Sequence, residues 1–131
     1  MKKYIGYLAF DFDCVIATYN RPFKFDNLGS PNYEVIETME YYSKLGYYIL
    51  IFTGRVCTPK MEKWLKKYNV PYNGFNVQPK DHLFASKYKP YYDLIVDDKA
   101  CNYHFKHNAK SKKEMIKEIN LILKWSKEGK R

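Results

Sequence analysis

Two aspartates stand one residue apart directly after an apolar run, in the segment LAFDFDCVIA that begins at Leu8. Residues i and i+2 of an extended chain point the same way, so Asp11 and Asp13 present their side chains together if the strand continues through them. A strand end can also splay them. Two carboxylates this close both stay ionised at neutral pH only if a cation lies between them; otherwise one of them holds a proton. Either arrangement is useful to an enzyme.

A second acidic pair, Asp97 and Asp98, follows another apolar run. Together with Asp11 and Asp13 it would complete an all-oxygen site suited to Mg²⁺, which prefers a few carboxylates plus water and substrate phosphate. The sequence has no His or Cys at ligand spacing beside these acids, which argues against zinc. We therefore expect Mg²⁺ as the cofactor.

Each polar group comes at the end of a predicted strand. The runs at 4–10, 47–52 and 92–96 are apolar throughout instead of alternating, which is typical of strands buried in a parallel sheet. The residues that follow them are Asp-Phe-Asp, Thr-Gly-Arg and Asp-Asp-Lys. Residues 73–77 are a weaker candidate for one more strand.

Helical spacing of apolar residues occurs between the strands. One such segment covers 35–42 and ends before Gly46, which suits the position after a helix, while another covers 61–68 and follows Thr58-Pro59, a predicted N-cap and first-turn proline. These apolar stripes are expected to face the core.

The chain is expected to close with an amphipathic helix, because Ser111 and Glu114 form a capping box ahead of it. Strands alternating with helices predict one α/β domain over residues 1–131, a three-layer Rossmann-like fold with a central, largely parallel sheet and helices on both faces. Such sheets bind ligands beyond the carboxyl ends of their strands, so the three polar groups should converge on one crevice.

The chain is basic, with 23 Lys and Arg against 14 Asp and Glu and a net charge of +9. This charge favours anionic partners such as phosphates or nucleic acid, although nucleotide bias in a genome gives the same lysine-rich composition. The first apolar run ends at Asp11, too early for a secretory signal, and no run approaches a membrane span. With three cysteines and no paired spacing, we expect a cytoplasmic protein that does not bind a membrane.

Four motifs in a fixed order carry a resemblance. They are DFDCV from Asp11, ILIFTGR ending at Arg55, a lysine in ASKYKP, and LIVDD ending at Asp98. The ordered set resembles the phosphohydrolases of the haloacid dehalogenase superfamily. A receiver domain of two-component signalling uses similar residues, but its acidic pair precedes its phospho-acceptor, and the order here is the reverse.

The resemblance implies a Mg²⁺-dependent phosphatase. Asp11 would attack phosphorus and form an aspartyl-phosphate, while Asp13 would protonate the leaving oxygen and then accept a proton from the attacking water. Thr53 and Lys87 would bind the transferring phosphoryl group.

The remaining site residues also follow from the resemblance. Gly54 and Arg55 would belong with Thr53 and Lys87 to the substrate-binding set. Mg²⁺ would be held by Asp11, the backbone carbonyl of Asp13, Asp97, and Asp98 either directly or through water.

Two positions depart from the family pattern or leave a choice open. Cys14 stands where the family most often has glycine, in the tight turn after the nucleophile. Lys80, Lys87 and Lys89 all precede the last strand, and we choose Lys87 because the small residues before it allow a close approach and its spacing to Asp97 is similar to the family's.

The chain has no room for a cap domain, because only residues 14–31 and 77–86 are available for one and an independent domain needs at least about 50 residues. An open site favours a large substrate, or a partner subunit that acts as a lid. The chain is also similar to the 3′-phosphatase domain of phage-type polynucleotide kinase-phosphatases.

The sequence leaves three functions open. A general phosphomonoesterase is the first hypothesis, and a polynucleotide 3′-phosphatase or nucleotide phosphatase, whose substrate is a nucleotide or a nucleic-acid end, is the second. The third is a non-catalytic nucleic-acid-binding module on the same fold, which the retention of Asp11, Asp13, Thr53 and Asp97 argues against.

Overall fold

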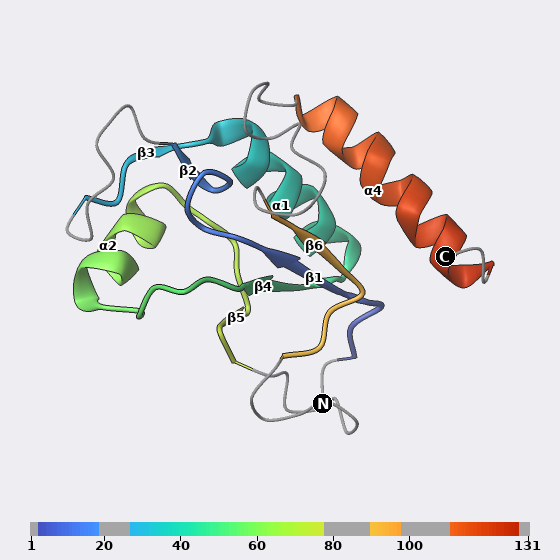
Figure 1. The fold of residues 1–131 in the computed structure, drawn as a ribbon, viewed down its shortest axis with the longest axis horizontal. Helices are drawn as coiled ribbons and strands as arrows, with labels where there is room; N and C mark the ends of the chain where they lie inside the picture. The colour runs from blue at the N-terminus through green and yellow to red at the C-terminus, as the bar shows by residue number, and fades with distance from the viewer. Residues whose placement is uncertain (1–2, 19–26, 78–89, 98–110, 129–131) are drawn as a thin grey trace.

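A four-stranded sheet forms the centre of the computed structural model, which describes residues 3–18, 27–77, 90–97 and 111–128. Within these residues the strand order is β5-β4-β1-β6, and every neighbouring pair is parallel. The strands are β1 (Tyr7–Phe10), β4 (Tyr48–Ile51), β5 (Gly74–Phe75) and β6 (Leu94–Val96). Figure 1 shows β1 and β4 side by side at the centre, with α2 and α4 at opposite ends of the molecule.

The predicted fold class is confirmed: the protein is an α/β domain with a central parallel sheet flanked by helices, consistent with a Rossmann-like three-layer fold. All four predicted strands are present, each shorter than its apolar run. In β1, Leu8, Ala9 and Phe10 are fully buried, and β4 is buried along its length, as expected for strands covered on both faces.

Helix α1 ends and helix α2 begins where the sequence predicts. Helix α1 (Tyr33–Leu45) ends at Gly46, whose φ of 104° lies in the left-handed region that glycine adopts without steric cost. Helix α2 (Pro59–Lys67) follows Thr58, and the Thr58 side chain accepts a hydrogen bond from the backbone N–H of Met61 at 3.2 Å.

Helix α4 (Lys112–Lys127) is the predicted C-terminal helix, and it packs beside α1 and β6. The Ser111 hydroxyl accepts the backbone N–H of Glu114 at 3.2 Å, as the capping pattern predicts. The buried Tyr42 hydroxyl of α1 donates to Asn120 Oδ1 of α4 at 2.7 Å, which ties the two helices together.

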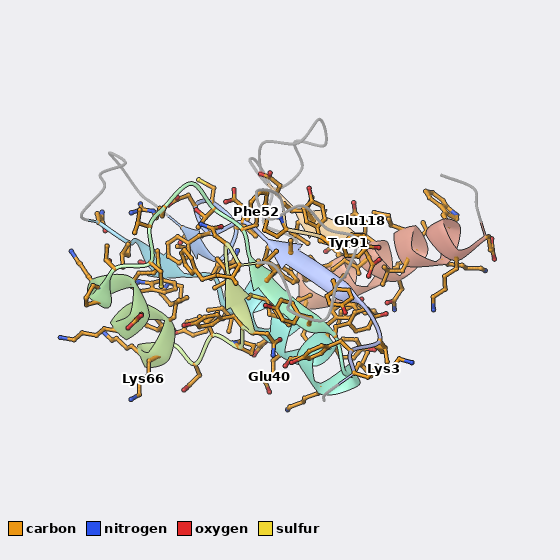
Figure 2. All side chains as sticks on the ribbon, turned by 90° about the horizontal axis from the view of Figure 1, so that it is seen from below. Lys3, Glu40, Phe52, Lys66, Tyr91 and Glu118 are labelled. Atoms are coloured by element: carbon orange, nitrogen blue, oxygen red, sulfur yellow. The ribbon has the colours of Figure 1, made fainter. Side chains whose placement is uncertain are left out.

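Two apolar clusters lie in the described part of the chain. The larger one joins the three described helices to alternate residues of the strands, among them Leu8, Phe10, Ile49 and Ile51. The smaller one contains Ala9, Tyr48 and Leu50, which face the opposite side of the sheet, and Phe52 packs against it. Figure 2 shows Phe52 on one side of the sheet, with Glu40 of α1 on the other. The sheet is therefore apolar on both faces.

A short antiparallel pair, which the sequence did not predict, lies between the first motif and α1. It consists of β2 (Ala17–Thr18) and β3 (Ser30–Pro31). The N–H of Asn32 donates to the carbonyl of Ile16 at 2.8 Å, which fixes the entry into α1. Among the described helices, none is long and apolar enough to cross a membrane.

Candidate active site

Asp11 lies at the carboxyl end of the central strand. Its backbone N–H donates to the carbonyl of Val96 at 2.9 Å, and on the other side the N–H of Phe52 donates to the carbonyl of Phe10 at 3.0 Å. The pairing beyond the strands therefore sets Asp11 between the ends of β4 and β6. Thr53 and Asp97 follow those two strands, so these three predicted site residues share one edge of the sheet.

The chain turns sharply after Asp11 instead of continuing as a strand. The carbonyl of Phe12 accepts the N–H groups of Val15 at 3.3 Å and Ala17 at 3.0 Å, and Phe12 itself is fully buried. Cys14 takes a φ of 64°, in the left-handed region. The glycine that the resemblance leads one to expect at position 14 would adopt this conformation without strain. The departure from the family pattern therefore changes the residue and leaves the turn in place.

Asp13 is held by Arg55, which comes from the loop after β4. The Arg55 Nε donates to both carboxylate oxygens of Asp13, at 2.9 and 3.0 Å. Its Nη2 donates to the carbonyl of Asn27 at 3.2 Å, and its guanidinium lies 5.8 Å from the centre of the Phe12 ring. The Arg55 side chain is only 7% exposed and that of Asp13 is 24% exposed. Arg55 therefore positions Asp13 and closes the turn after Asp11.

The loop after β4 gives the site a hydroxyl and an open backbone. The Thr53 hydroxyl accepts the N–H of Arg55 at 3.3 Å, so its own hydrogen remains available to donate. A Cβ added to Gly54 would meet nothing within 4 Å, and its φ does not lie in the left-handed region, so the fold does not require glycine there. Gly54 leaves space at the surface into which a ligand could approach the backbone.

Asn76, which the sequence analysis did not single out, holds this loop in place. Its side-chain Oδ1 accepts the N–H of Thr53 at 2.8 Å, while Nδ2 donates to the carbonyls of Thr53 at 2.8 Å and Arg55 at 3.2 Å. Its backbone N–H donates to the carbonyl of Ile51 at 2.8 Å, and its φ is 55°. One side chain therefore fixes the loop that carries Thr53, Gly54 and Arg55.

The acidic side chains offer oxygen ligands from two neighbouring strand ends. Asp11 and Asp97 are both partly buried, and Asp11 Oδ1 accepts the N–H of Phe12 at 2.8 Å. In the described ranges, no group of three or more His, Cys, Asp and Glu side chains is arranged to hold a metal ion. Because Mg²⁺ needs only one or two protein carboxylates, the donor chemistry of Asp11 and Asp97 still fits it.

Several predicted site residues lie outside the described residues. These are Lys87, its alternatives Lys80 and Lys89, and Asp98. The structure therefore brings together Asp11, Asp13, Thr53, Gly54, Arg55 and Asp97. The choice among the three lysines stays a prediction.

Two residues of this region were missed by sequence reasoning, for different reasons. Asn76 directly follows the observed strand β5, but it lies inside the predicted 73–77 strand, so the expected position of the strand end concealed it. Asn27 contributes its backbone carbonyl to Arg55, and a backbone group leaves no signal in residue type.

Comparison with known proteins supports the fold. The sequence matches no protein-family model and no curated protein. A conserved protein from Bacteroides thetaiotaomicron has a similar structure, with a TM-score of 0.59 and 18% identity over 84% of this chain and 96% of that one. A structural-genomics target from Vibrio cholerae matches with a TM-score of 0.52 and 21% identity over 93% of this chain and 99% of that one. Likeness at this identity shows the fold alone, and neither description names an activity.

The turn at position 14 gives a first prediction. A residue with a Cβ in the left-handed region is strained by about 1–2 kcal/mol, and glycine relieves this strain at some cost in unfolded-state entropy. We expect Cys14→Gly to raise the free energy of unfolding in urea by about 0.5–1 kcal/mol. Cys14→Ala removes the same thiol but keeps Cβ, so it should give no such gain. An equal gain in both variants would assign the effect to the thiol.

The Arg55–Asp13 pair gives a second prediction. Arg55→Gln leaves a largely buried carboxylate without its cation, so we expect the free energy of unfolding to fall by about 2–3 kcal/mol, less than for a fully buried pair. Lys44→Gln is the matched control, because it breaks the exposed Lys44–Glu40 pair (2.7 Å) on α1. Urea unfolding of both variants measures the difference. Equal losses would show that the Arg55 pair behaves as a surface pair.

Asn76 gives a third prediction. Glycine at position 76 can adopt the φ of 55°, and Asn76→Gly removes the three side-chain hydrogen bonds to the loop. We therefore expect the amide hydrogen of Thr53 to exchange with solvent at least about tenfold faster. Asn73→Ala is the control, since Asn73 also bonds β4, through the N–H of Ile49 at 2.8 Å, but at the opposite end of β5. If Asn73→Ala raises the exchange rate at Thr53 by as much, Asn76 has no specific role in holding the loop.

Proposed function

We propose that the protein is a phosphomonoester hydrolase of the haloacid dehalogenase type, with Asp11 as its nucleophile. The observation that carries this proposal is the position of Asp11 between the ends of β4 and β6, with Thr53 on one side and Asp97 on the other. A carboxylate flanked by a hydroxyl donor and a second carboxylate at the carboxyl edge of a parallel sheet suits attack on a bound phosphate.

The proposed reaction has two displacements. An Asp11 carboxylate oxygen attacks phosphorus, the bond to the ester oxygen breaks, and the leaving alkoxide takes a proton from Asp13. Water then attacks the aspartyl-phosphate, the bond between phosphorus and Asp11 breaks, and the water proton returns to Asp13. Inorganic phosphate and the alcohol are the products, and both aspartates are restored.

The Arg55–Asp13 contact bears on how Asp13 is oriented for this role. A carboxylate has about four lone-pair positions, and the Arg55 Nε engages both oxygens from one side. The contact supports a fixed orientation of Asp13 rather than direct contact of Arg55 with phosphate, because the Arg55 side chain is buried. We therefore assign Arg55 to positioning, and the exposed backbone at Gly54 and the Thr53 hydroxyl to the phosphoryl group.

Mg²⁺ fits this proposal through oxygen donors. The carboxylates of Asp11 and Asp97 and the backbone carbonyl of Asp13 would hold it, together with Asp98 from outside the described residues. A bound Mg²⁺ supplies positive charge that offsets the charge on the phosphoryl oxygens. Lys87 is proposed to add a second positive charge at the same group.

Asp11→Asn tests the nucleophile. An amide is not an anionic nucleophile, so we expect phosphate release to fall by about 10³-fold or more while the unfolding curve stays close to that of the wild type. Asp93→Asn is the matched control: Asp93 lies at the opposite end of β6, where its carboxylate accepts the N–H of Tyr7 at 2.8 Å, which an amide oxygen can also do. It should retain activity.

The assay measures phosphate release with Mg²⁺ over sugar phosphates, nucleotides and oligonucleotides phosphorylated at either end. Wild-type protein that binds Mg²⁺ yet is inert on all of them would overturn the proposal in favour of a non-catalytic module. Full activity in Asp11→Asn would overturn the assignment of the nucleophile.

A further inference from the structure

A basic pocket lies between α2 and residues 27–29, which precede β3. It has a volume of about 330 Å³ and is called the α2 pocket below. Its described lining residues are Asn27, Leu28, Gly29, Lys60, Lys63, Trp64, Lys67 and Tyr68. None of these described residues is acidic, so the pocket has the chemistry of an anion site.

The α2 pocket is joined to the candidate active site through Asn27. The Asn27 carbonyl accepts Nη2 of Arg55 at 3.2 Å, and Arg55 in turn holds Asp13. On the pocket side, the Trp64 indole N–H donates to the carbonyl of Gly29 at 3.2 Å, which fixes the wall against α2. Asn27 therefore contributes both to the contacts of Arg55 beside the turn after Asp11 and to the inner wall of the pocket.

The lysines of the pocket form one stripe along α2. Lys60, Lys63 and Lys67 are spaced three and four residues apart, which places them on the same face of a helix, and all three are exposed. With a rise of 1.5 Å per residue the stripe is about 10 Å long. It starts in the first turn of α2, which directly follows the Thr53–Arg55 loop, and leads away from it.

The charge of α2 differs from that of an ordinary solvated helix. It carries four lysines and one glutamate, whereas α1 carries three glutamates and one lysine. The single acid of α2, Glu62, does not line the pocket. Helix α2 therefore carries a net positive charge, and three of its four lysines line the pocket.

The length of the stripe distinguishes between ligands. A single phosphate would need one or two cations close together, whereas three lysines over about 10 Å match a ligand with several phosphates in a row. The partly buried Tyr68 ring, with Lys67 Nζ 5.2 Å from its centre, adds an apolar wall of the kind that suits sugars and bases.

We propose that the α2 pocket binds the phosphate backbone of a single-stranded nucleic acid whose phosphorylated end lies at Asp11. The position of that end rests on the proposed function, whereas binding of the strand to α2 does not. The pocket then selects polynucleotide ends over small phosphate esters.

The test compares two variants of the same helix. Lys63→Gln/Lys67→Gln removes two charges from the stripe, while the control Lys66→Gln removes a charge from an exposed lysine that does not line the pocket and projects outward in Figure 2. Binding of a fluorescent oligothymidylate of about twelve nucleotides with a 3′-phosphate is measured by anisotropy from about 50 to 200 mM salt.

We expect the double variant to bind at least about tenfold more weakly at the lowest salt. The negative slope of log K against log salt should become shallower by about 1.4, or about 0.7 for each lost phosphate contact. Lys66→Gln should stay within about twofold of the wild type. Equal losses per charge in the two variants, or no binding of the oligonucleotide by the wild type, would overturn the proposal.

A turnover assay separates the pocket from the active site. With thymidine 3′-phosphate as substrate, the double variant should match the wild type, because a mononucleotide does not reach the stripe. An equal loss of phosphate release from the oligonucleotide and from thymidine 3′-phosphate would overturn the proposal, because it would assign the lysines to the transferring phosphate. Pocket-dependent binding without any phosphatase activity would refute the proposed function alone, and phosphatase activity with unchanged binding would refute the pocket alone.

Discussion

The pairing of β1 with β4 on one side and β6 on the other is the constraint on which the candidate site depends. The register aligns Phe10 with Ile51 and with Val96, so the residues that follow these three positions must leave the sheet at the same edge. The buried apolar residues of β1 and β4 enforce that register, because a slip by one residue would exchange the side chains that pack in the two apolar clusters, and closely packed interiors do not tolerate such a change in size and shape. The hydrophobic core thus determines where Asp11 lies relative to Thr53 and Asp97.

Arg55 extends this constraint beyond the sheet. It joins the loop after β4 to Asp13 and to the carbonyl of Asn27. Because its side chain is only 7% exposed, losing one of these contacts would leave a buried charge with fewer hydrogen-bond partners. A guanidinium suits this position because its donors point in fixed directions and can serve a carboxylate and a carbonyl at once. The turn after Asp11, the loop after β4 and the inner wall of the α2 pocket are therefore shaped by one side chain.

Two residues in the left-handed region lie in this part of the fold, Cys14 after the nucleophile and Asn76 after β5. In both cases the backbone turns within a few residues of a strand end, which leaves room at the edge of the sheet. Asn is among the non-glycine residues that best tolerate this conformation, and here its amide also replaces the sheet pairing that β4 and β5 no longer provide. Cys14 lies in a turn that the hydrogen bonds to the Phe12 carbonyl hold in place.

The sequence by itself determined the fold class, three sheet strands with a weaker indication of the fourth, the end of α1 and the starts of α2 and α4. Continuous apolar runs, the glycine at position 46, the Thr58-Pro59 start of α2 and Ser111 are local signals, and local backbone chemistry was sufficient to interpret them. It also identified Asp11, Thr53 and Asp97 as neighbours, because parallel strands place their carboxyl ends together. The short β2–β3 pair escaped prediction since neither strand is long enough to show a periodic pattern.

Only the tertiary structure decided what each polar side chain contacts. The spacing of Asp11 and Asp13 allowed parallel or splayed side chains, and the turn at Cys14 together with Arg55 settled the orientation of Asp13. Arg55 was predicted to bind substrate, and that stays a prediction; its burial against Asp13, Asn27 and Phe12 is the reason for the positioning role proposed above. The part played by Asn76 and the pocket beside α2 depend on segments that are distant along the chain. A residue's type shows which interactions its side chain can make. Which partner a long side chain contacts depends on which backbone segments the core packing brings within its reach.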